Sequence, residues 1–548
     1  MSGEAGSRAQ LARRAGVVSA AVLSSRVLGL VREQVFAVAF GAGRSLDAFV
    51  TAFRIPNLLR DLFAEGALSA AFVTTFSQTL ERDGERAAWR LASLVLNVLA
   101  IVVGALCLLG IWAAPALSHA MAPGFAAVPG KLELTVSLTR IMFPFLLLVA
   151  LAAVVMGILN TRNHFGVPAS ASTFFNLGSV VGGLACVHWM APGYLGAVWA
   201  ELRGGAVAAF DPDLAARAIT GMAIGTMIGG VLQLAVQLPS LFAVGFRWRP
   251  VLAWRDPALR QVLALMAPAT IGAAAVQVNV FVNNNFASYL GDGAVSWLNV
   301  AFRFMQLPIG LFGVAIGTVT LPLVSRHAAR GDHAAMRTSL RQALEMTVLL
   351  CLPAAVGLAV FGEPIIGLIY EHGRFDAHDT THAAQALAGY AIGLAGYAGI
   401  KVVAPAFYAL DDARTPARVS LLSIATNLGL NWLFVRVLGW GTVGLALSTS
   451  AVAIGNCAVL LWVLRRRIGS LGAGLGTAVG RIALAAAVMT AVSVLLDAVC
   501  APYWPAAGTA RHAARVAVAI PVSVGAFWVA CRVLGVPVPR LRRRRAAA

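Results

Sequence analysis

Apolar runs long enough to cross a bilayer recur along almost the whole of this 548-residue chain. Each run has about 20 predominantly apolar residues, the length of helix that spans about 30 Å of hydrocarbon. Hydrophobic residues make up 59% of the sequence and charged residues only 12%, against about 45–50% and about 25% in soluble domains. Within hydrocarbon only helices and closed barrels satisfy their backbone polar groups. The sequence therefore predicts an all-α integral membrane protein.

We place about fourteen membrane spans by this criterion. Their centres lie near residues 25, 60, 100, 147, 177, 231, 272, 309, 350, 396, 425, 453, 488 and 522. Counting by loops assigns 27 of the 42 Lys and Arg residues to the side that holds both termini, and eight to the opposite side. Because basic residues concentrate in cytoplasmic loops, this asymmetry predicts that both termini are cytoplasmic. It also accounts for the net charge of +19 without nucleic acid as a partner.

Several arginines lie inside these apolar runs. Arg26 and Arg32 belong to the first span, and Arg54 and Arg60 belong to the second together with Asp47. A charge at bilayer depth costs at least about 2.5–3.5 kcal/mol, so such residues usually face a water-filled cavity. Guanidinium donates two parallel hydrogen bonds to phosphate or carboxylate groups. The cluster predicts a transport path for an anion. The alternative is that the arginines pair with Glu33, Asp47, Asp61 or Glu65 and only hold helices together.

Two motif pairs indicate an internal repeat. AFR at 52–54 is matched by AFR at 301–303, and the Pro-to-Asn segment 168–176 resembles 416–427. Both matches are offset by six spans, which predicts two six-helix lobes related by a pseudo-two-fold axis along the membrane normal. Two C-terminal helices are then appended. The predicted division is residues 1–245, 246–468 and 469–548, the last holding spans 13 and 14 and a basic cytoplasmic tail.

Motifs of enzymes and metalloproteins are missing from the sequence. There is no GxxxxGK[ST] phosphate loop, no GxSxG and no HExxH. The segment EHGRFDAHDTTH at 371–382 could offer metal ligands, but we interpret it as a hydrated loop. Six cysteines are scattered through apolar runs and are interpreted as small core residues. The prediction is a protein that is not an enzyme and has no metal site or bound cofactor.

A family resemblance is carried by longer motifs along nearly the whole chain. They are SRVLGLVRE (25–33), DAFVTAFRIPNLLR (47–60), FAEGALSAAFV (63–73), MAPGFA (121–126), FPFLLL (143–148), SWLNVAFRFMQLPIGLFGVAIGTVTLP (296–322) and KVVAPAFYALDDARTP (401–416). The chain resembles the MurJ (MviN) family of lipid II flippases, within the multidrug/oligosaccharidyl-lipid/polysaccharide exporter superfamily. The resemblance implies fourteen helices in two lobes, a central cationic cavity, alternating access and a lipid groove formed with the last two helices.

The resemblance also implies site residues. Arg26, Arg32 and Arg60 match the family's cavity arginines, Asp47 its cavity aspartate and Arg303 the arginine of the second lobe. The full predicted substrate-binding set is Arg26, Arg32, Arg60, Arg303, Asp47, Arg54 and Glu65. Phe302 and Gln306 stand where many relatives have acids, and the segment 188–218 is longer than usual. Gly480 and Ala487 are expected to face the lipid groove, and Gly29 to permit a bend between Arg26 and Arg32.

The predicted function is to flip lipid II, undecaprenyl-diphosphate disaccharide-pentapeptide, from the cytoplasmic to the periplasmic leaflet of a bacterial inner membrane. Membrane potential or a cation gradient would drive the cycle, since moving one charge across 100 mV is worth about 2.3 kcal/mol. Expected partners are lipid II, membrane lipids, and cell-wall synthesis and division proteins. The alternatives are a flippase or exporter of another polyprenyl-diphosphate-linked saccharide, and a non-transporting scaffold for cell-wall synthesis. A cationic-drug exporter would need cavity acids rather than arginines.

Overall fold

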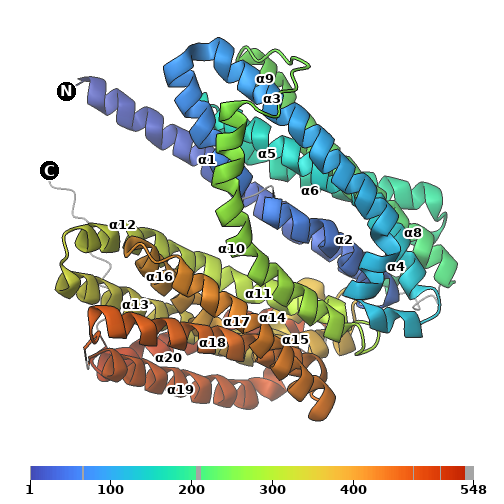
Figure 1. Ribbon diagram of the computed structural model, residues 1–548. Helices are drawn as coiled ribbons and strands as arrows, with labels where there is room; N and C mark the ends of the chain where they lie inside the picture. The colour runs from blue at the N-terminus through green and yellow to red at the C-terminus, as the bar shows by residue number, and fades with distance from the viewer. Residues whose placement is uncertain (1, 64–66, 205–210, 473, 506–507, 537–548) are drawn as a thin grey trace. The chain divides into compact units, whose positions relative to one another are not determined.

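The computed structural model describes residues 2–63, 67–204, 211–472, 474–505 and 508–536. All regular structure in these ranges is helical (Figure 1). The chain folds into two compact units. Unit 1 holds residues 1–296 and 372–376, and unit 2 holds residues 297–371 and 377–548.

Unit 1 contains the first ten α-helices and one 3-10 turn. Their bounds are α1 Ser2–Phe40, α2 Arg44–Phe63, α3 Ala67–Met121, η1 Pro123–Ala127, α4 Lys131–Met142, α5 Phe145–Thr161, α6 Gly166–Met190, α7 Tyr194–Leu202, α8 Pro212–Ala235, α9 Leu238–Ala243 and α10 Pro257–Ala287. The long α3 is broken at Gly84, where φ is 79°. This break lies between Arg82 and Arg86, so the polar connection between the two apolar parts of α3 is a helix break rather than an open loop.

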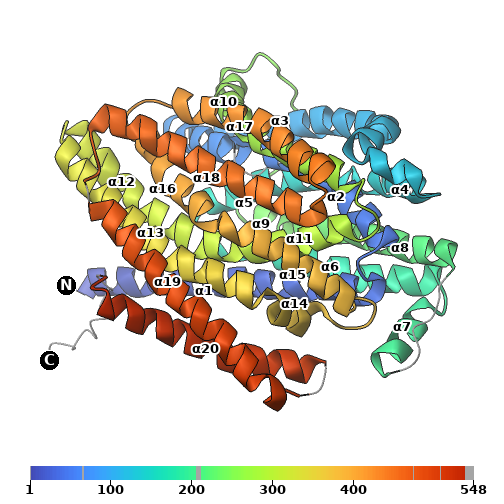
Figure 2. The ribbon, with the colours of Figure 1, turned by 90° about the horizontal axis from the view of Figure 1, so that it is seen from below.

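Unit 2 contains the remaining helices, from Trp297 of α11 onward; the first three residues of α11 belong to unit 1. Their bounds are α11 Ala294–Pro308, η2 Ile309–Val314, α12 Ala315–Ala329, α13 His333–Val360, α14 Gly362–Tyr370, α15 Ala377–Ile392, α16 Leu394–Ala409, α17 Arg414–Asn431, η3 Trp432–Val437, α18 Gly441–Ile468, α19 Gly474–Cys500, η4 Ala501–Tyr503 and α20 Thr509–Val533. The elements η2 and η3 are π-helical turns. Figure 2 shows α19 and α20 lying side by side along one edge of this unit.

Nine helical segments of the described chain are long and apolar enough to cross a membrane, or ten if the bent pair α15–α16 counts as one span. This confirms a multi-pass all-helical protein. Each of the fourteen predicted centres lies within a helix. The helix α2 is not among these apolar segments, because its 20 residues include the charged residues Asp47, Arg54, Arg60 and Asp61.

Aspartates define several helix starts. Asp211, Asp256 and Asp332 each accept a backbone N–H bond at the first turn of α8, α10 and α13, as expected for capping residues. Asp412 does the same before α17, accepting from the Thr415 N–H at 3.0 Å. The hydrogen bonds from Thr415, together with Arg467, hold the pKa of Asp412 below its usual value. The DDARTP motif therefore ends one helix and begins the next.

Small residues allow the closest helix packing. A Cβ atom on Gly225 of α8 would lie 2.2 Å from the Gly183 Cα of α6. A Cβ on Gly317 of α12 would lie 2.4 Å from the Lys401 carbonyl oxygen of α16. Without these glycines the backbones could not approach so closely.

The boundary between the two units differs from the predicted division at residues 245 and 246. The helix α10 packs against α2 and α3, so its packing places it in unit 1, although the repeat assigns it to the second lobe. The repeat-based division describes correspondence between halves rather than packing, and it stays a prediction. The two proline-containing segments of the repeat begin their helices at the same position: α6 and α17 each start two residues before their proline, Pro168 and Pro416.

Candidate functional site

The arginine of α1 at position 32 lies against α6 in unit 1. Its side chain is 17% exposed, its guanidinium carbon lies 5.1 Å from the centre of the Phe175 ring, and Glu33 lies 3.9 Å away. Asn176 fixes the two helices by donating from Nδ2 to the Ser25 carbonyl at 3.0 Å. A half-buried guanidinium over an aromatic face is stabilised by cation–π attraction.

The expected bend at Gly29 is not observed. The helix α1 runs unbroken from Ser2 to Phe40. A Cβ on Gly29 would lie 3.5 Å from Asn176 Nδ2, an ordinary van der Waals contact. Packing against α6 therefore does not require a glycine at this position.

Arg54 of α2 is anchored on α10. Its Nη1 donates to Asn284 Oδ1 at 3.0 Å, and Asn284 in turn donates from Nδ2 to the Met121 carbonyl at 3.2 Å. Asn284 is buried. Because both ends of the amide are engaged, the acceptor for Arg54 is held in one orientation.

Arg60 of α2 pairs with the adjacent Asp61. Its Nε and Nη2 lie 3.2 and 3.0 Å from Asp61 Oδ1, and the arginine side chain stays 24% exposed. Gln277 of α10 donates to the other carboxylate oxygen at 3.2 Å. The contact supports the pairing alternative for Arg60.

Asp47, at the start of α2, lies in a buried network of unit 1. It is 0% exposed and accepts from Lys131 Nζ at 3.0 Å. It also accepts from the Gly293 N–H at 2.8 Å and from the N–H and Oγ of Ser296 at 2.9 and 2.7 Å. Asp292 takes a further Lys131 bond at 2.6 Å. With several donors on its two oxygens, Asp47 positions the chain before α11.

We expect Lys131→Ala to destabilise unit 1 strongly. Removing one partner of a buried ion pair costs about 3–5 kcal/mol, because the other charge stays buried. Asp292→Asn is the matched control: Asp292 is 46% exposed, and losing a pair this exposed costs about 0–1 kcal/mol. Thermal unfolding of the purified variants in detergent measures both. Equal melting temperatures for the two variants would contradict the buried-pair interpretation.

The other predicted site residues are placed as follows. Arg26 is exposed on α1, and Arg303 is exposed on α11 in unit 2. Phe302 turns its ring edge toward Tyr390, with centroids 5.5 Å apart, and Gln306 is exposed. Glu65 lies outside the described residues. Lys131, Asn284 and Gln277 were missed by the sequence analysis, which had counted Lys131 as an ordinary loop lysine.

The segment after α6, which the family resemblance led us to expect to be long, contains the short helix α7 (Tyr194–Leu202). Tyr194, fully buried at its start, donates from its hydroxyl to the Ala39 carbonyl at 2.8 Å. Burial raises the pKa of Tyr194 to about 12. At the other end Glu201 accepts from Arg374 at 3.3 Å. The segment thus ties residues 372–376 to the end of α1 within unit 1.

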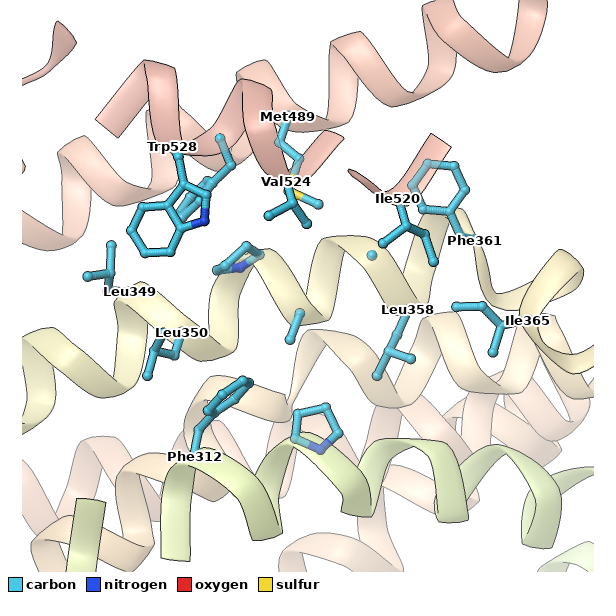
Figure 3. Close-up of a pocket in the computed structure, with 15 residues that line it drawn as sticks. Phe312, Leu349, Leu350, Leu358, Phe361, Ile365, Met489, Ile520, Val524 and Trp528 are labelled. Carbon is cyan, nitrogen blue, oxygen red and sulfur yellow. The ribbon is translucent and has the colours of Figure 1, made fainter. Parts of the chain in front are cut away.

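Unit 2 contains an apolar cavity of about 330 Å³ between α13, α14, α19 and α20 (Figure 3). Its lining consists of apolar residues and includes Leu349, Leu358, Met489, Val524 and Trp528, with Phe312 contributed by η2. A second cavity of about 290 Å³ shares Leu349 and extends past Glu345 and Ile482. Gly480 and Ala487, expected to face a groove here, line neither cavity.

The chain matches known proteins over most of its length. The family model described as "Lipid II flippase MurJ" matches residues 36–510. The lipid II flippase MurJ of Burkholderia cenocepacia is 38% identical over 82% of this chain and 83% of its own length. The probable lipid II flippase MurJ of Vibrio cholerae is 34% identical over 96% of both chains.

Solved structures agree in fold. The structure titled "Lipid II flippase MurJ, inward closed conformation" superposes with a TM-score of 0.73 at 26% identity, covering 94% of this chain and 99% of that one. An inward-facing MATE-family multidrug resistance transporter of the MOP superfamily superposes with a TM-score of 0.66 at 14% identity, covering 82% and 95%; at this identity the likeness is one of fold alone. On the sequence match, this multi-pass bacterial membrane protein belongs to the MurJ lipid II flippase family.

Proposed function

We propose that this protein flips lipid II from the cytoplasmic to the periplasmic leaflet. The observation that carries the proposal is membership of the lipid II flippase family over most of the chain, together with the arginines of α1 and α2. A transporter makes and breaks no bond in its substrate, so the protein is not an enzyme in this proposal.

The head group of lipid II fits the arginines of α1 and α2. Its diphosphate is anionic, and guanidinium groups bind phosphate oxygens through paired hydrogen bonds. Arg26, Arg32, Arg54 and Arg60 are the proposed contacts in unit 1, and Arg303 is the proposed contact in unit 2. Asp47 acts through the backbone it holds, so it is a positioning residue in this proposal.

The prenyl tail fits the apolar cavity of unit 2. Each CH₂ group moved from apolar surroundings into water costs about 0.8 kcal/mol. A tail of tens of carbons therefore stays in hydrocarbon while the head group crosses. The cavity between α13, α14, α19 and α20 offers an entirely apolar wall for it.

The proposed architecture has fourteen spans: two six-helix lobes with pseudo-two-fold symmetry, followed by α19 and α20. The protein would lie in the bacterial inner membrane with both termini in the cytoplasm. The excess of Lys and Arg on one side supports this orientation. Alternating access driven by membrane potential or a cation gradient is the proposed cycle, and cell-wall synthesis and division proteins are proposed partners.

Cysteine labelling tests the topology. In a variant without native cysteines, Ser470→Cys before α19 should resist a membrane-impermeant thiol reagent in intact cells. Tyr503→Cys, at a site 83% exposed after α19, should react. Both cysteines should react once the membrane is permeabilised, which controls for accessibility. The reverse pattern in intact cells would place the termini outside.

Depletion tests the transported substrate. When the protein is depleted from its native cells, lipid II should accumulate in the inner leaflet. Expression of the wild-type chain should reverse the accumulation. Accumulation of a different polyprenyl-diphosphate saccharide would favour the second candidate substrate, and unchanged precursor pools would favour a scaffold.

A further inference from the structure

Two histidines on the first turns of α15 face each other at ligand distance. His378 and His382 are four residues apart, so their side chains lie on the same face of the helix. Their Nε2 atoms are 3.1 Å apart. The sequence analysis had interpreted residues 371–382 as a hydrated loop, which is wrong from Ala377 onward because α15 begins there.

Trp297 of α11 holds both imidazole rings in place. The His382 ring stacks on its indole with centroids 4.4 Å apart and planes at 14°, and the His378 ring meets it edge-on at 5.6 Å and 69°. Trp297 is itself 8% exposed, and its Nε1 donates to the buried Asp379 at 2.8 Å. The two nitrogens are therefore preorganised by a packed and hydrogen-bonded neighbour.

This spacing fits metal chelation. Imidazole nitrogens bind zinc at about 2.0–2.1 Å, so two of them lie about 2.8–3.0 Å apart when cis at an octahedral ion and about 3.3–3.4 Å apart at a tetrahedral ion. Two histidines at i and i+4 on one helix face form the metal-binding pair of zinc proteases. The Asp379 carboxylate has an oxygen within 4.8 Å of a ring nitrogen of His378, which places negative charge beside that imidazole.

We propose that His378 and His382 chelate a divalent transition metal ion of the Zn²⁺, Ni²⁺ or Cu²⁺ class through their Nε2 atoms. Water completes the coordination, since His378 is exposed to solvent. Asp379 and Trp297 act as positioning residues, because ligand histidines depend on the groups that orient them. The competing explanation is a hydrogen bond in which one imidazole donates its proton to the other, with no metal. The proposal does not depend on the transported substrate.

Copper titration tests the site. Purified full-length protein in detergent, with any affinity tag removed, is titrated with Cu²⁺ alone and followed by electron paramagnetic resonance. Cu²⁺ is the probe because it binds nitrogen sites most tightly in the divalent series. We expect one bound ion with hyperfine coupling to two nitrogens. His378→Ala and His382→Ala should each leave one coupled nitrogen and weaken binding by about tenfold or more.

Three further variants sharpen the test. Trp297→Phe keeps an aromatic ring but loses the bond to Asp379, and it should weaken Cu²⁺ binding while leaving two coupled nitrogens. His164→Ala and His333→Ala remove exposed histidines elsewhere and should leave binding unchanged. Melting temperatures without metal show that each variant is folded. A spectrum unchanged in His378→Ala/His382→Ala, or no specific binding by the wild type, would overturn the proposal in favour of the shared proton.

Discussion

Alanine at Arg26, Arg32 or Arg60 is expected to abolish growth of a strain that depends on this protein, with near-normal amounts of the variant in the membrane. A hydrogen bond to a charged group contributes about 1.5–3 kcal/mol, which corresponds to about 10- to 100-fold in the rate of flipping if it acts in the transported complex. Lysine should rescue only partly, because it lacks the planar pair of donors. Complementation measures growth, and quantitative immunoblots measure the amount of each variant in the membrane.

Asp61→Asn distinguishes a substrate contact from helix pairing at Arg60. If Arg60 only pairs with Asp61 at 3.0 Å, Arg60→Ala and Asp61→Asn should reduce growth equally. If Arg60 binds the diphosphate, Asp61→Asn should be much milder, since it leaves the guanidinium in place. Arg203→Ala is the control for loss of an arginine, because Arg203 is exposed and stacks on Trp199 at 4.9 Å. Full activity of Arg26→Ala, Arg32→Ala and Arg60→Ala would disprove the assignment of these arginines to the substrate site.

The positions of the helices could be predicted because span length is set by the bilayer. Where helices break was less predictable. The pair α15–α16 bends by 41° at Gly393, and a Cβ there would lie 2.6 Å from the Ser450 Cα of α18. That requirement comes from a helix more than fifty residues away in the sequence, and no local pattern carries it.

The sequence also could not predict which face of each apolar helix contacts protein and which contacts lipid. In α19 nearly every residue is apolar or small, so no polar stripe marks which side meets protein and which meets lipid. Gly480 and Ala487 were expected to face the groove, yet α19 instead contributes Met489, Ala478 and Ile482 to the two cavities. Lys131 was missed because a lysine between two apolar runs is normally expected to be exposed to solvent. Its burial depends on Asp47, which is 84 residues away in the sequence.

Gly357→Trp is expected to block flipping while the protein stays folded and keeps its affinity for the head group. Gly357 lines the apolar cavity of unit 2, and a Cβ there meets no atom within 4 Å. A side chain at this position therefore starts without a clash at its Cβ, and we expect the indole to reduce the cavity of about 330 Å³. Because the proposed role of this cavity is to accommodate the prenyl tail, transport should fall about as far as in the arginine variants.

Gly525→Trp is the matched control on α20. Its Cβ position also meets no atom within 4 Å, but it does not line the cavity, so transport should be retained. Photo-crosslinking from Val524 to a prenyl-labelled substrate should succeed in the wild type and fail in Gly357→Trp. The arginine variants should show the opposite defect, with the tail still crosslinked and the head group poorly bound. If Gly357→Trp and Gly525→Trp transport equally well, the tail does not use this cavity. That result would not affect the proposal that the arginines bind the head group.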